Sequence, residues 1–386
     1  MRAPDIDRLS AALAPHDKRI ATPALVIDEV AVRHNIRAVI ARLDGDTRRW
    51  RPHIKTDKQA AILDLLREEG VEACKCATVD ELSLALEQAR ARSSAADVVV
   101  AYPLHGANLR GALALRARYP QARVQLLVDS PAHAQIVNAA ARERAIVLQV
   151  QLDVDLGMGR TGSPPAVWRE AVAALAELAN LEITGLHGYD GHHSWEARAA
   201  AHAGYDQLIA LADVYGPGPL ELITSGTHSY AHALAHEGLG IGHAAGTFHH
   251  QISPGTVVLS DRRSHRAAAD LGLVQAAFVL ARVVSRDEVR VTLDAGSKAI
   301  APDCPPPTCA VLDHPELTPQ APSEEHLPLS ITRPPGPSLG ELVWLVPEHV
   351  CTTVNLHRAA LLVDASGEVR TSIVRAGGRY PWITPT

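Results

Sequence analysis

The stretch Arg51-Pro52-His53-Ile54-Lys55-Thr56-Asp57-Lys58 decides how the rest of this chain is interpreted. An extended run leads into it, and residues 59–66 after it have the apolar spacing of a helix. Lys55 is therefore predicted where a strand ends and a helix begins. On a strand, Arg51, His53 and Lys55 share one face, and three cationic or titratable groups cannot form an ordinary apolar core.

Two interpretations of Lys55 remain open on spacing alone. The face that it shares with Arg51 and His53 can be a solvated edge, because charged side chains are mostly exposed. Alternatively, Lys55 points into a pocket, where neighbouring cations lower its pKa and allow its amine to form a Schiff base.

Composition narrows the class of protein. A chain of 386 residues is long for one core and predicts two domains, one of which can be a barrel. The content of 47% hydrophobic and 21% charged residues is ordinary for a soluble globular protein. With a net charge of -6 and no basic cluster among aromatic residues, we expect no nucleic-acid partner. The N-terminus lacks an apolar signal core and no run is long enough to span a bilayer, so we expect a cytoplasmic protein without a membrane partner.

Strand-like and helix-like segments alternate through the first two thirds of the chain. Candidate strands are residues 24–28, 50–55, 73–78, 97–103, 123–129, 147–155, 183–191 and 222–226. Candidate helices between them include residues 29–43, 79–91, 131–144, 165–179 and 195–214. This alternation predicts a parallel sheet, and eight such units close a (β/α)8 barrel whose site lies at the C-terminal ends of the strands.

The pattern changes after about residue 255. Candidate strands at 256–260, 276–285, 288–293, 342–346 and 359–363 follow one another without regular helices, and prolines crowd into loops at 302–322 and 334–337. This part is predicted to be a mostly antiparallel β domain.

Several polar motifs fall at the ends of the predicted barrel strands. Residues 153–162 form a glycine-rich turn that carries Arg160, which suits an anionic oxygen. Residues 185–193 bring Tyr189, His192 and His193 close together. The small hydroxyl residues and glycines at 224–229 and 253–256 suit a phosphate. A Schiff-base lysine together with a phosphate site indicates pyridoxal phosphate.

The cysteines do not form a disulfide framework. Cys74 and Cys76 share a face of a predicted strand, and we expect buried thiols there. His349 and Cys351 are two residues apart, so on a strand both would project to one face and could chelate a divalent ion. Imidazole and thiolate favour zinc over calcium or magnesium, and two protein ligands leave positions open for water and substrate.

Six motifs together resemble the D-threonine aldolase and D-serine dehydratase family. They are Arg-Pro-His-Ile-Lys-Thr at 51–56, Gly-Met-Gly-Arg-Thr-Gly at 157–162, Gly-Leu-His-Gly-Tyr at 185–189, Leu-Asp-Ala-Gly-Ser-Lys at 293–298, Glu-Glu-His at 324–326 and Pro-Glu-His-Val-Cys at 347–351. The family is similar to alanine racemase in fold. The resemblance implies a pyridoxal-phosphate-binding (β/α)8 barrel at 30–255 and a β domain at 256–386 that carries the metal site, with residues 1–29 packing on it. It makes residues 50–55 the first barrel strand and places the eighth near 247–253.

The same resemblance implies a role for each candidate residue. Lys55 carries the cofactor as an aldimine, His53 contacts it, Arg160 touches its phenolate oxygen and Tyr189 lies beside its ring. The phosphate is held by Ser225, Gly226, Thr227, Gly255, Thr256 and Val257. His349 and Cys351 bind a divalent metal, for which zinc is favoured and manganese is the alternative, and the metal binds the β-hydroxyl of the substrate. Our own hypothesis for the aldol direction adds His192 or His193 as the base that removes the hydroxyl proton.

The implied activity is that of a lyase for D-3-hydroxy amino acids, small molecules that a homodimer would bind. Aldol cleavage to glycine and an aldehyde is favoured, and dehydration to a 2-oxo acid and ammonia is the alternative. Family members usually have histidine at the position of Asp57, a different run at 225–228, and in the aldolases often aspartate where Cys351 stands. An amino-acid racemase has no need of His349 and Cys351, and a non-catalytic pyridoxal phosphate carrier would lack the β domain.

Overall fold

The computed structural model describes residues 3–215 and 220–375. The chain divides into two compact units. Of the described residues, the β unit comprises 3–42, 56–69 and 256–375, and the barrel unit comprises 43–55, 70–215 and 220–255. Each unit is described by itself below.

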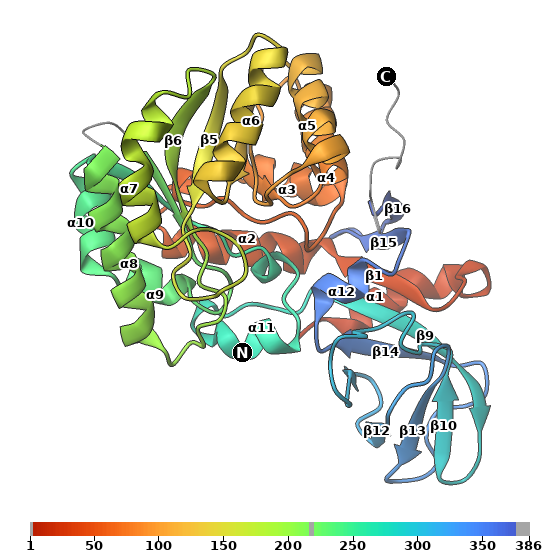
Figure 1. Cartoon of the computed structure of the whole chain (residues 1–386). Coiled ribbons are helices and arrows are strands. Elements are labelled where there is room, and N and C mark those ends of the chain that lie inside the picture. Colours follow the sequence, from red (N-terminus) through yellow and green to blue (C-terminus); the bar gives the residue numbers. More distant parts are fainter. Residues whose placement is uncertain (1–2, 216–219, 376–386) are drawn as a thin grey trace. The chain divides into compact units, whose positions relative to one another are not determined.

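The barrel unit is built on a seven-stranded parallel sheet with the strand order β2-β3-β4-β5-β6-β7-β8 (Figure 1). The strands are β2 (Ala73–Cys76), β3 (Asp97–Val100), β4 (Arg123–Val128), β5 (Leu148–Asp153), β6 (Leu181–Gly188), β7 (Leu220–Thr224) and β8 (Phe248–Ile252). Sequence order equals spatial order, as in a barrel that grows by one βα unit at a time. The predicted alanine racemase-like fold class is confirmed.

The segment expected as the first barrel strand is irregular, so that expectation is wrong in detail. Trp50 bridges Ile252 of β8, and His53 bridges Lys75 of β2, both in parallel. The Arg51 amide donates to the Ile252 carbonyl and the Ile54 amide donates to the Lys75 carbonyl. Pro52 has no amide hydrogen to donate to a ladder, and only its carbonyl takes part, by accepting from the Lys75 amide at 2.8 Å. The segment nevertheless hydrogen-bonds to both edge strands of the sheet.

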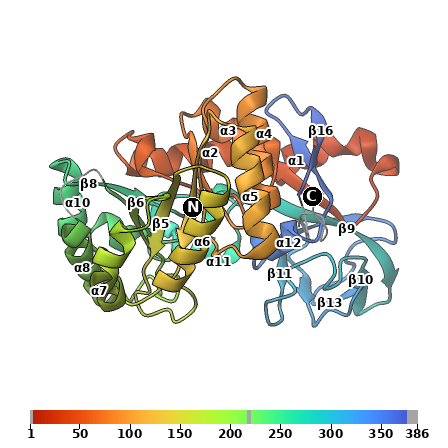
Figure 2. The same ribbon diagram turned by 45° about the horizontal axis from the view of Figure 1, so that its top comes forward.

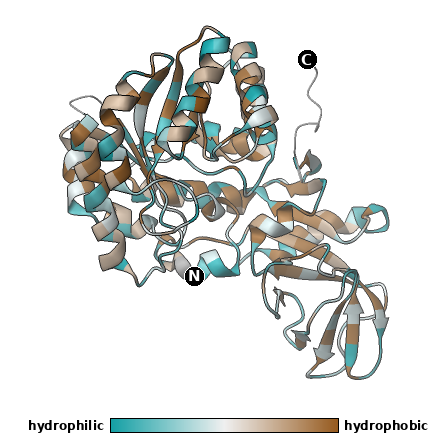
Figure 3. Cartoon of the chain, viewed as in Figure 1, coloured by the Kyte–Doolittle hydropathy of each residue, from teal (hydrophilic) through white to brown (hydrophobic). Residues whose placement is uncertain are grey.

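Helices cover the outer face of this sheet (Figures 1 and 2). They include α4 (Val79–Ala91), α5 (Gly106–Arg118), α6 (Pro131–Glu143), α7 (Pro165–Ala176) and α8 (Arg198–Ala212), with the short α9 (Tyr230–Leu234) and α10 (Glu237–Ala244). The Thr78 side chain caps α4 and the Ser130 side chain caps α6, each by accepting from an amide in the first turn. Brown and teal segments alternate on these helices in Figure 3, as amphipathic packing requires. The sequence analysis missed α5.

A charged network fills the barrel interior near the N-terminal ends of the strands. Arg51 is fully buried and donates to both carboxylate oxygens of Asp97, at 2.8 and 3.0 Å. Arg123 donates to Asp97 and to Glu221, and the amide groups of Gln125 and Gln151 donate to Glu221 as well. Most donors and acceptors of this network pair with one another, so we interpret it as a structural layer that closes the N-terminal end of the barrel unit.

The β unit is built on a nine-stranded sheet. Its main path has the order β12-β13-β10-β9-β1-β15-β16, and β14 pairs with β9 and β11. The strands are β1 (Ala24–Asp28), β9 (Ala277–Arg286), β10 (Arg290–Leu293), β11 (Cys309–Val311), β12 (Leu317–Pro319), β13 (Leu327–Ile331), β14 (Leu342–Pro347), β15 (Ala359–Val363) and β16 (Val369–Ile373). β1 pairs in parallel with β15 and antiparallel with β9. The other pairs are antiparallel, as predicted.

Helices α1 (Ile6–Leu13), α2 (Glu29–Arg42), α3 (Ala60–Glu68), α11 (Arg262–Ala267) and α12 (Val350–Val354) also belong to the β unit. The strand expected at 256–260 is wrong. Thr256–Val258 is a 3₁₀ turn, because the Thr256 carbonyl accepts locally from the Leu259 and Ser260 amides. Among residues 3–215 and 220–375, no helix has the length and apolar composition that crossing a bilayer requires.

Candidate active site

Cationic side chains gather around Tyr189 at the C-terminal ends of the barrel strands. The Arg160 guanidinium lies 4.9 Å from the centre of the Tyr189 ring, and the Lys75 ammonium lies 5.6 Å from it. The structure therefore brings together Arg160 and Tyr189, which the motifs had placed on two different strand ends. It adds Lys75, which sequence reasoning missed.

Lys75 belongs to a chain of three buried side chains on β2, β5 and β6. Its Nζ lies 3.1 Å from Nε2 of His187, and Nδ1 of His187 lies 2.8 Å from Oδ1 of Asp153. Burial and the nearby charge of Lys55 lower the pKa of Lys75 to about 7. Burial and Lys75 likewise lower the pKa of His187. In sequence Lys75 is visible only as the residue between two cysteines, although its inward-facing position was a signal.

His53 and Lys55 belong to the same part of the barrel unit. The Lys55 side chain is exposed, and its backbone amide donates to Nδ1 of His53 at 3.3 Å. Burial, followed by the charges of Lys55 and Lys75, lowers the pKa of His53 well below its usual range. The charges of Lys55 and Arg160 thus act on the buried Lys75, and Asp153 opposes them. Such a cluster fits an anionic ligand such as a pyridoxal phosphate, which would offset the excess positive charge.

The loop after β7 is the better of the two candidate phosphate loops. Ser225 has a left-handed backbone with a φ of 61°. Its hydroxyl is buried and has no hydrogen-bond partner among the described residues. A buried hydroxyl without a partner costs free energy unless a ligand supplies one, so this atom also fits a phosphate ester.

Gly226 contributes space to this loop. Its amide already donates to the Ser229 hydroxyl at 3.2 Å. A Cβ at this position would lie 3.0 Å from the Tyr189 ring, so the glycine lets Tyr189 pack closely on the loop. Thr227, the third predicted residue, is buried as well.

A buried network supports the loop from behind. Asp190 accepts from the Ser229 hydroxyl at 2.6 Å and from the Tyr205 hydroxyl at 2.5 Å. Burial and the Asp190 charge raise the pKa of Tyr205, so its phenol stays a donor. Because Ser229 in turn accepts from Gly226, the network fixes the loop relative to the end of β6.

The second candidate phosphate loop is divided between the two units. Gly255 lies in the barrel unit, where a Cβ would stand 2.2 Å from the His53 carbonyl oxygen, so only glycine fits. Thr256 and Val257 belong to the β unit, and Val257 is fully buried. Their contact with a phosphate stays a prediction.

His192 and His193 lie in the loop between β6 and α8. Their ring centroids are 3.9 Å apart. His192 is exposed and His193 is partly buried, and burial together with His192 lowers the pKa of His193. A neutral imidazole can accept a proton, so both remain candidate bases.

The structure brings His349 and Cys351 together in the β unit at the start of a helix, whereas the sequence analysis expected a strand. The strand predicted for them is wrong: β14 ends at Pro347, His349 is the N-cap of α12, and Cys351 lies in its first turn. Burial lowers the pKa of His349, but its interactions with Cys351 and Asp303 outweigh burial and raise this pKa to about 9. Burial raises the pKa of Cys351, and its hydrogen bond with His349 more than reverses that effect.

The surroundings of Cys351 suit a thiolate. The hydroxyls of Thr56 and Thr256 lie 3.3 and 3.4 Å from its sulfur. Thr56 directly follows Lys55 in the chain. A thiolate beside an imidazole is a donor set that fits zinc. Asp303 and Cys304, in a loop that the prolines had marked, have ligand atoms within 4.8 Å of one another and of His349; sequence reasoning missed both.

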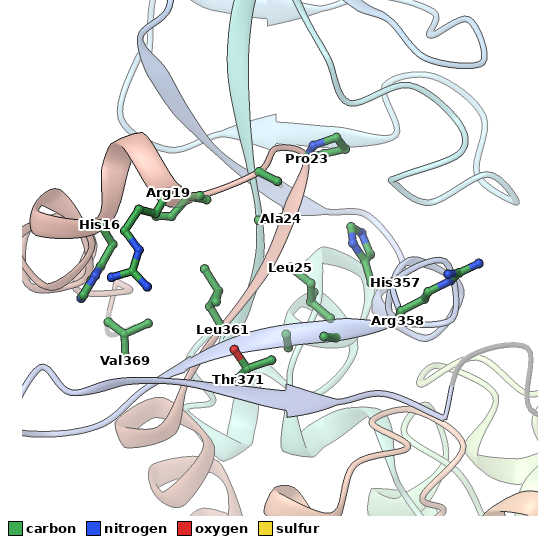
Figure 4. A pocket seen from close by; sticks show the side chains of 14 residues that line it. His16, Arg19, Pro23, Ala24, Leu25, His357, Arg358, Leu361, Val369 and Thr371 are labelled. Atoms are coloured by element: carbon green, nitrogen blue, oxygen red, sulfur yellow. The ribbon is translucent and has the colours of Figure 1, made fainter.

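A pocket of about 480 Å³ lies elsewhere in the β unit (Figure 4). Leu25, Leu361 and Val369 supply apolar surface, and His16, Arg19 and Arg358 are among its polar lining residues. It contains none of the predicted site residues.

Comparison with known proteins identifies the family. The model for "Alanine racemase, N-terminal domain" matches residues 27–236, more than half of the chain. The model for "Putative serine dehydratase domain" matches residues 276–363. The chain therefore belongs to the family of the alanine racemase N-terminal domain, with a dehydratase-type domain after it. The resemblance inferred from the motifs is confirmed.

Individual relatives narrow the comparison. A D-threonine aldolase from Arthrobacter sp. is 29% identical over 361 residues, which cover 89% of each chain. A D-threo-3-hydroxyaspartate dehydratase from Delftia sp. is 33% identical over 141 residues, 36% of this chain and 35% of the relative. The crystal structure of D-threonine aldolase from Filomicrobium marinum has a TM-score of 0.80 at 24% identity and covers 93% of this chain and 96% of its own.

Proposed function

We propose that this protein is a pyridoxal-phosphate- and metal-dependent lyase that acts on D-3-hydroxy amino acids. The observation that carries the proposal is the cationic cluster around Tyr189, which joins the exposed Arg160 to the buried Lys75 at the strand ends where (β/α)8 barrels keep their site. The orphaned hydroxyl of Ser225 supports it. The relatives named above are aldolases and dehydratases of D-configured hydroxy amino acids.

Each residue of the barrel cluster has a distinct task in this proposal. Lys55 is the attachment point of the cofactor and, when released, a base. Arg160 meets the phenolate oxygen, Tyr189 packs beside the ring, and Ser225 and Thr227 hold the phosphate. His53 contacts the cofactor from the segment that carries Lys55. When bound, the cofactor supplies an electron sink for a bond at the substrate Cα.

His349 and Cys351 hold the divalent ion in this proposal. The ion supplies Lewis acidity at the β-hydroxyl of the substrate, and the donor set favours zinc over manganese. A solved variant of a D-threo-3-hydroxyaspartate dehydratase, with a TM-score of 0.76, is in a metal-free form, which supports a metal in this fold. His192 or His193 accepts the hydroxyl proton.

Aldol cleavage is the favoured reaction, because the Arthrobacter aldolase aligns along 89% of the chain whereas the Delftia dehydratase aligns along 36%. It converts D-threonine to glycine and acetaldehyde. The alternative, dehydration, converts a hydroxy amino acid to a 2-oxo acid and ammonia. Cys351 is the observation that favours the alternative, because aldolases of this family often carry aspartate there.

The test measures products and cofactor absorbance together. Incubation with D-threonine and D-serine, with and without chelator, should give acetaldehyde and glycine from D-threonine, and the chelator should stop turnover. Lys55→Ala should lose both the cofactor absorbance band and turnover. Cys351→Ala should keep the band and lose at least 100-fold in turnover, roughly the loss of a Lewis acid worth several kcal/mol.

The matched control is L-threonine, which should not react. A 2-oxo acid and ammonia as products would select the dehydratase. Turnover that is indifferent to chelator and to Cys351→Ala would contradict the metal, and a cofactor band that survives Lys55→Ala would contradict the whole assignment. We also propose a cytoplasmic homodimer; light scattering of the purified protein tests the oligomeric state.

A further inference from the structure

We propose that Asp303 is a positioning residue of the metal site. Its carboxylate holds Nδ1 of His349, so that Nε2 of the same ring faces the ion. The inference rests on the proposed function, because it concerns the metal of that same site. It deepens that function by adding a residue that neither the motifs nor the comparisons assign. All the residues that carry it lie in the β unit.

The contact between the two side chains is short. Oδ2 of Asp303 lies 2.6 Å from Nδ1 of His349. Oδ1 of the same carboxylate accepts from the Thr352 hydroxyl at 2.6 Å. Both oxygens of Asp303 are therefore engaged by α12 and its N-cap, and the carboxylate cannot rotate without losing one of these bonds.

The backbone around the pair is fixed as well. The Thr353 hydroxyl donates to the His349 carbonyl at 2.8 Å and accepts from the Ala301 amide at 2.9 Å. The Val350 amide donates to Asp261 at 2.8 Å. The bond from Ala301 to Thr353 thus joins the loop that carries Asp303 to α12, and Asp261 holds the first residue of α12. Both bonds help to keep the Asp303–His349 distance short.

The chemistry of imidazole turns this geometry into an orientation. A ring whose Nδ1–H is donated to a carboxylate keeps its free lone pair on Nε2. Metal-binding histidines commonly have such a partner, which fixes the tautomer, sets the ring plane and increases the basicity of the ligating nitrogen. The Cys351 side chain is hydrogen-bonded to the same imidazole, so the ring and the sulfur are close enough to act as two ligands of one ion.

A direct three-ligand site is the competing arrangement. Ligand atoms of Asp303, Cys304 and His349 lie within 4.8 Å of one another, which would allow an ion between them. That ion would have to replace the 2.6 Å bond between Asp303 and His349. The two arrangements make opposite demands on Cys304 and Cys351, so two cysteine variants separate them.

The experiment measures zinc affinity of the full-length protein by competition with a chromophoric chelator. Asp303→Ala should weaken zinc binding about 10- to 100-fold, the usual effect of removing such a supporting partner. Asp303→Asn, which keeps an oxygen that can accept from Nδ1–H, should lose less. Cys304→Ala should bind zinc as the parent protein does, and Cys351→Ala should lose tight binding.

Cobalt substitution gives a second readout that a merely structural role would not move. The thiolate-to-cobalt absorbance band should persist in Asp303→Asn and Cys304→Ala at saturating cobalt and disappear in Cys351→Ala. Thermal unfolding of the metal-free variants checks that they fold. If Asp303→Ala does not fold, the zinc affinity of Asp303→Asn is compared with that of the parent protein instead.

Three outcomes overturn the inference. Unchanged zinc affinity in both Asp303 variants would remove its role. A loss in Cys304→Ala equal to that in Cys351→Ala would establish the three-ligand arrangement instead. A parent protein that binds no zinc, manganese or cobalt would refute both this inference and the metal part of the proposed function. The cofactor part of the proposed function would not be affected, because it is tested separately by Lys55→Ala.

Discussion

The ammonium group of Lys75 is buried beside other cationic groups, so its charged form costs free energy in the folded chain. Its partner His187 is 112 residues away in sequence. No local pattern announces a pair at that separation. The sequence predicted the site residues that belong to motifs, among them Arg160, Tyr189 and His349. It did not predict Lys75 and Asp303, because their roles depend on contacts with residues distant in the sequence.

Lys75 predicts a pH dependence of stability. Its folded pKa, about 7, lies below the usual lysine value of 10.5, so between these values the unfolded chain binds more protons. The contribution of Lys75 to the free energy of unfolding therefore rises with pH. Below pH 7 the lysine is charged in both states, and its full destabilising effect is present. Lys75→Met should stabilise the cofactor-free protein, by about 2–3 kcal/mol more at pH 6 than at pH 9.

Urea denaturation of the cofactor-free proteins at the two pH values measures this difference. Lys18→Met, a substitution of an exposed lysine, is the control and should show no such difference. A Lys75→Met variant whose advantage is the same at pH 6 and pH 9 would show that the buried charge is not the cause.

At the scale of elements, periodicity predicted most of the barrel. α4 of the barrel unit occurs at the predicted residues, and most other barrel elements are within a few residues of their predicted bounds. In the β unit, β1 also occurs at the predicted residues. The failures have local causes. Pro52 interrupts the first strand, and the turn after β14 places His349 and Cys351 at the start of a helix rather than on a strand. Such irregular segments depend on tertiary contacts, and the spacing of apolar residues along the sequence carries no information about these contacts.

The charged network at the N-terminal end of the barrel unit depends on one buried cation. Arg51→Met would leave the carboxylates of Asp97 and Glu221 with fewer donors in a buried setting. We expect a loss of about 3 kcal/mol in the free energy of unfolding, typical of breaking a buried ion pair from one side. Urea denaturation measures it.

The control for Arg51 is Arg48, whose side chain is 80% exposed and pairs with Asp46. Arg48→Met should cost less than about 1 kcal/mol, as exposed ion pairs do. Equal losses in the two variants would show that burial does not set the strength of the charged network.

At the scale of the whole molecule, the sequence predicted a barrel followed by a β domain, and the chain is more interleaved than that. It passes between the two units at 42/43, 55/56, 69/70 and 255/256. Composition marked the last of these passages through the change from helices to strands. The earlier ones leave no such mark, because α2 and α3 have ordinary helical patterns whichever unit they join.

This interleaving predicts that residues 1–255 will not fold alone. β1 lies between β9 and β15 in the sheet, and the fragment lacks both partners. A five-residue strand without neighbours leaves its backbone groups unpaired and its buried side chains exposed. The fragment should show no cooperative thermal transition by circular dichroism, in contrast to the full chain. A sharp transition in the fragment would contradict this.

The left-handed backbone of Ser225 has a consequence for how this loop can vary. Glycine would adopt that conformation more easily, by about 1 kcal/mol. Serine is present despite this handicap, and its hydroxyl gains nothing from the described part of the chain. Ser225 therefore lowers the stability of the loop and in return offers a hydroxyl to a ligand. Selection of variants for higher thermal stability would favour glycine here and so remove that hydroxyl.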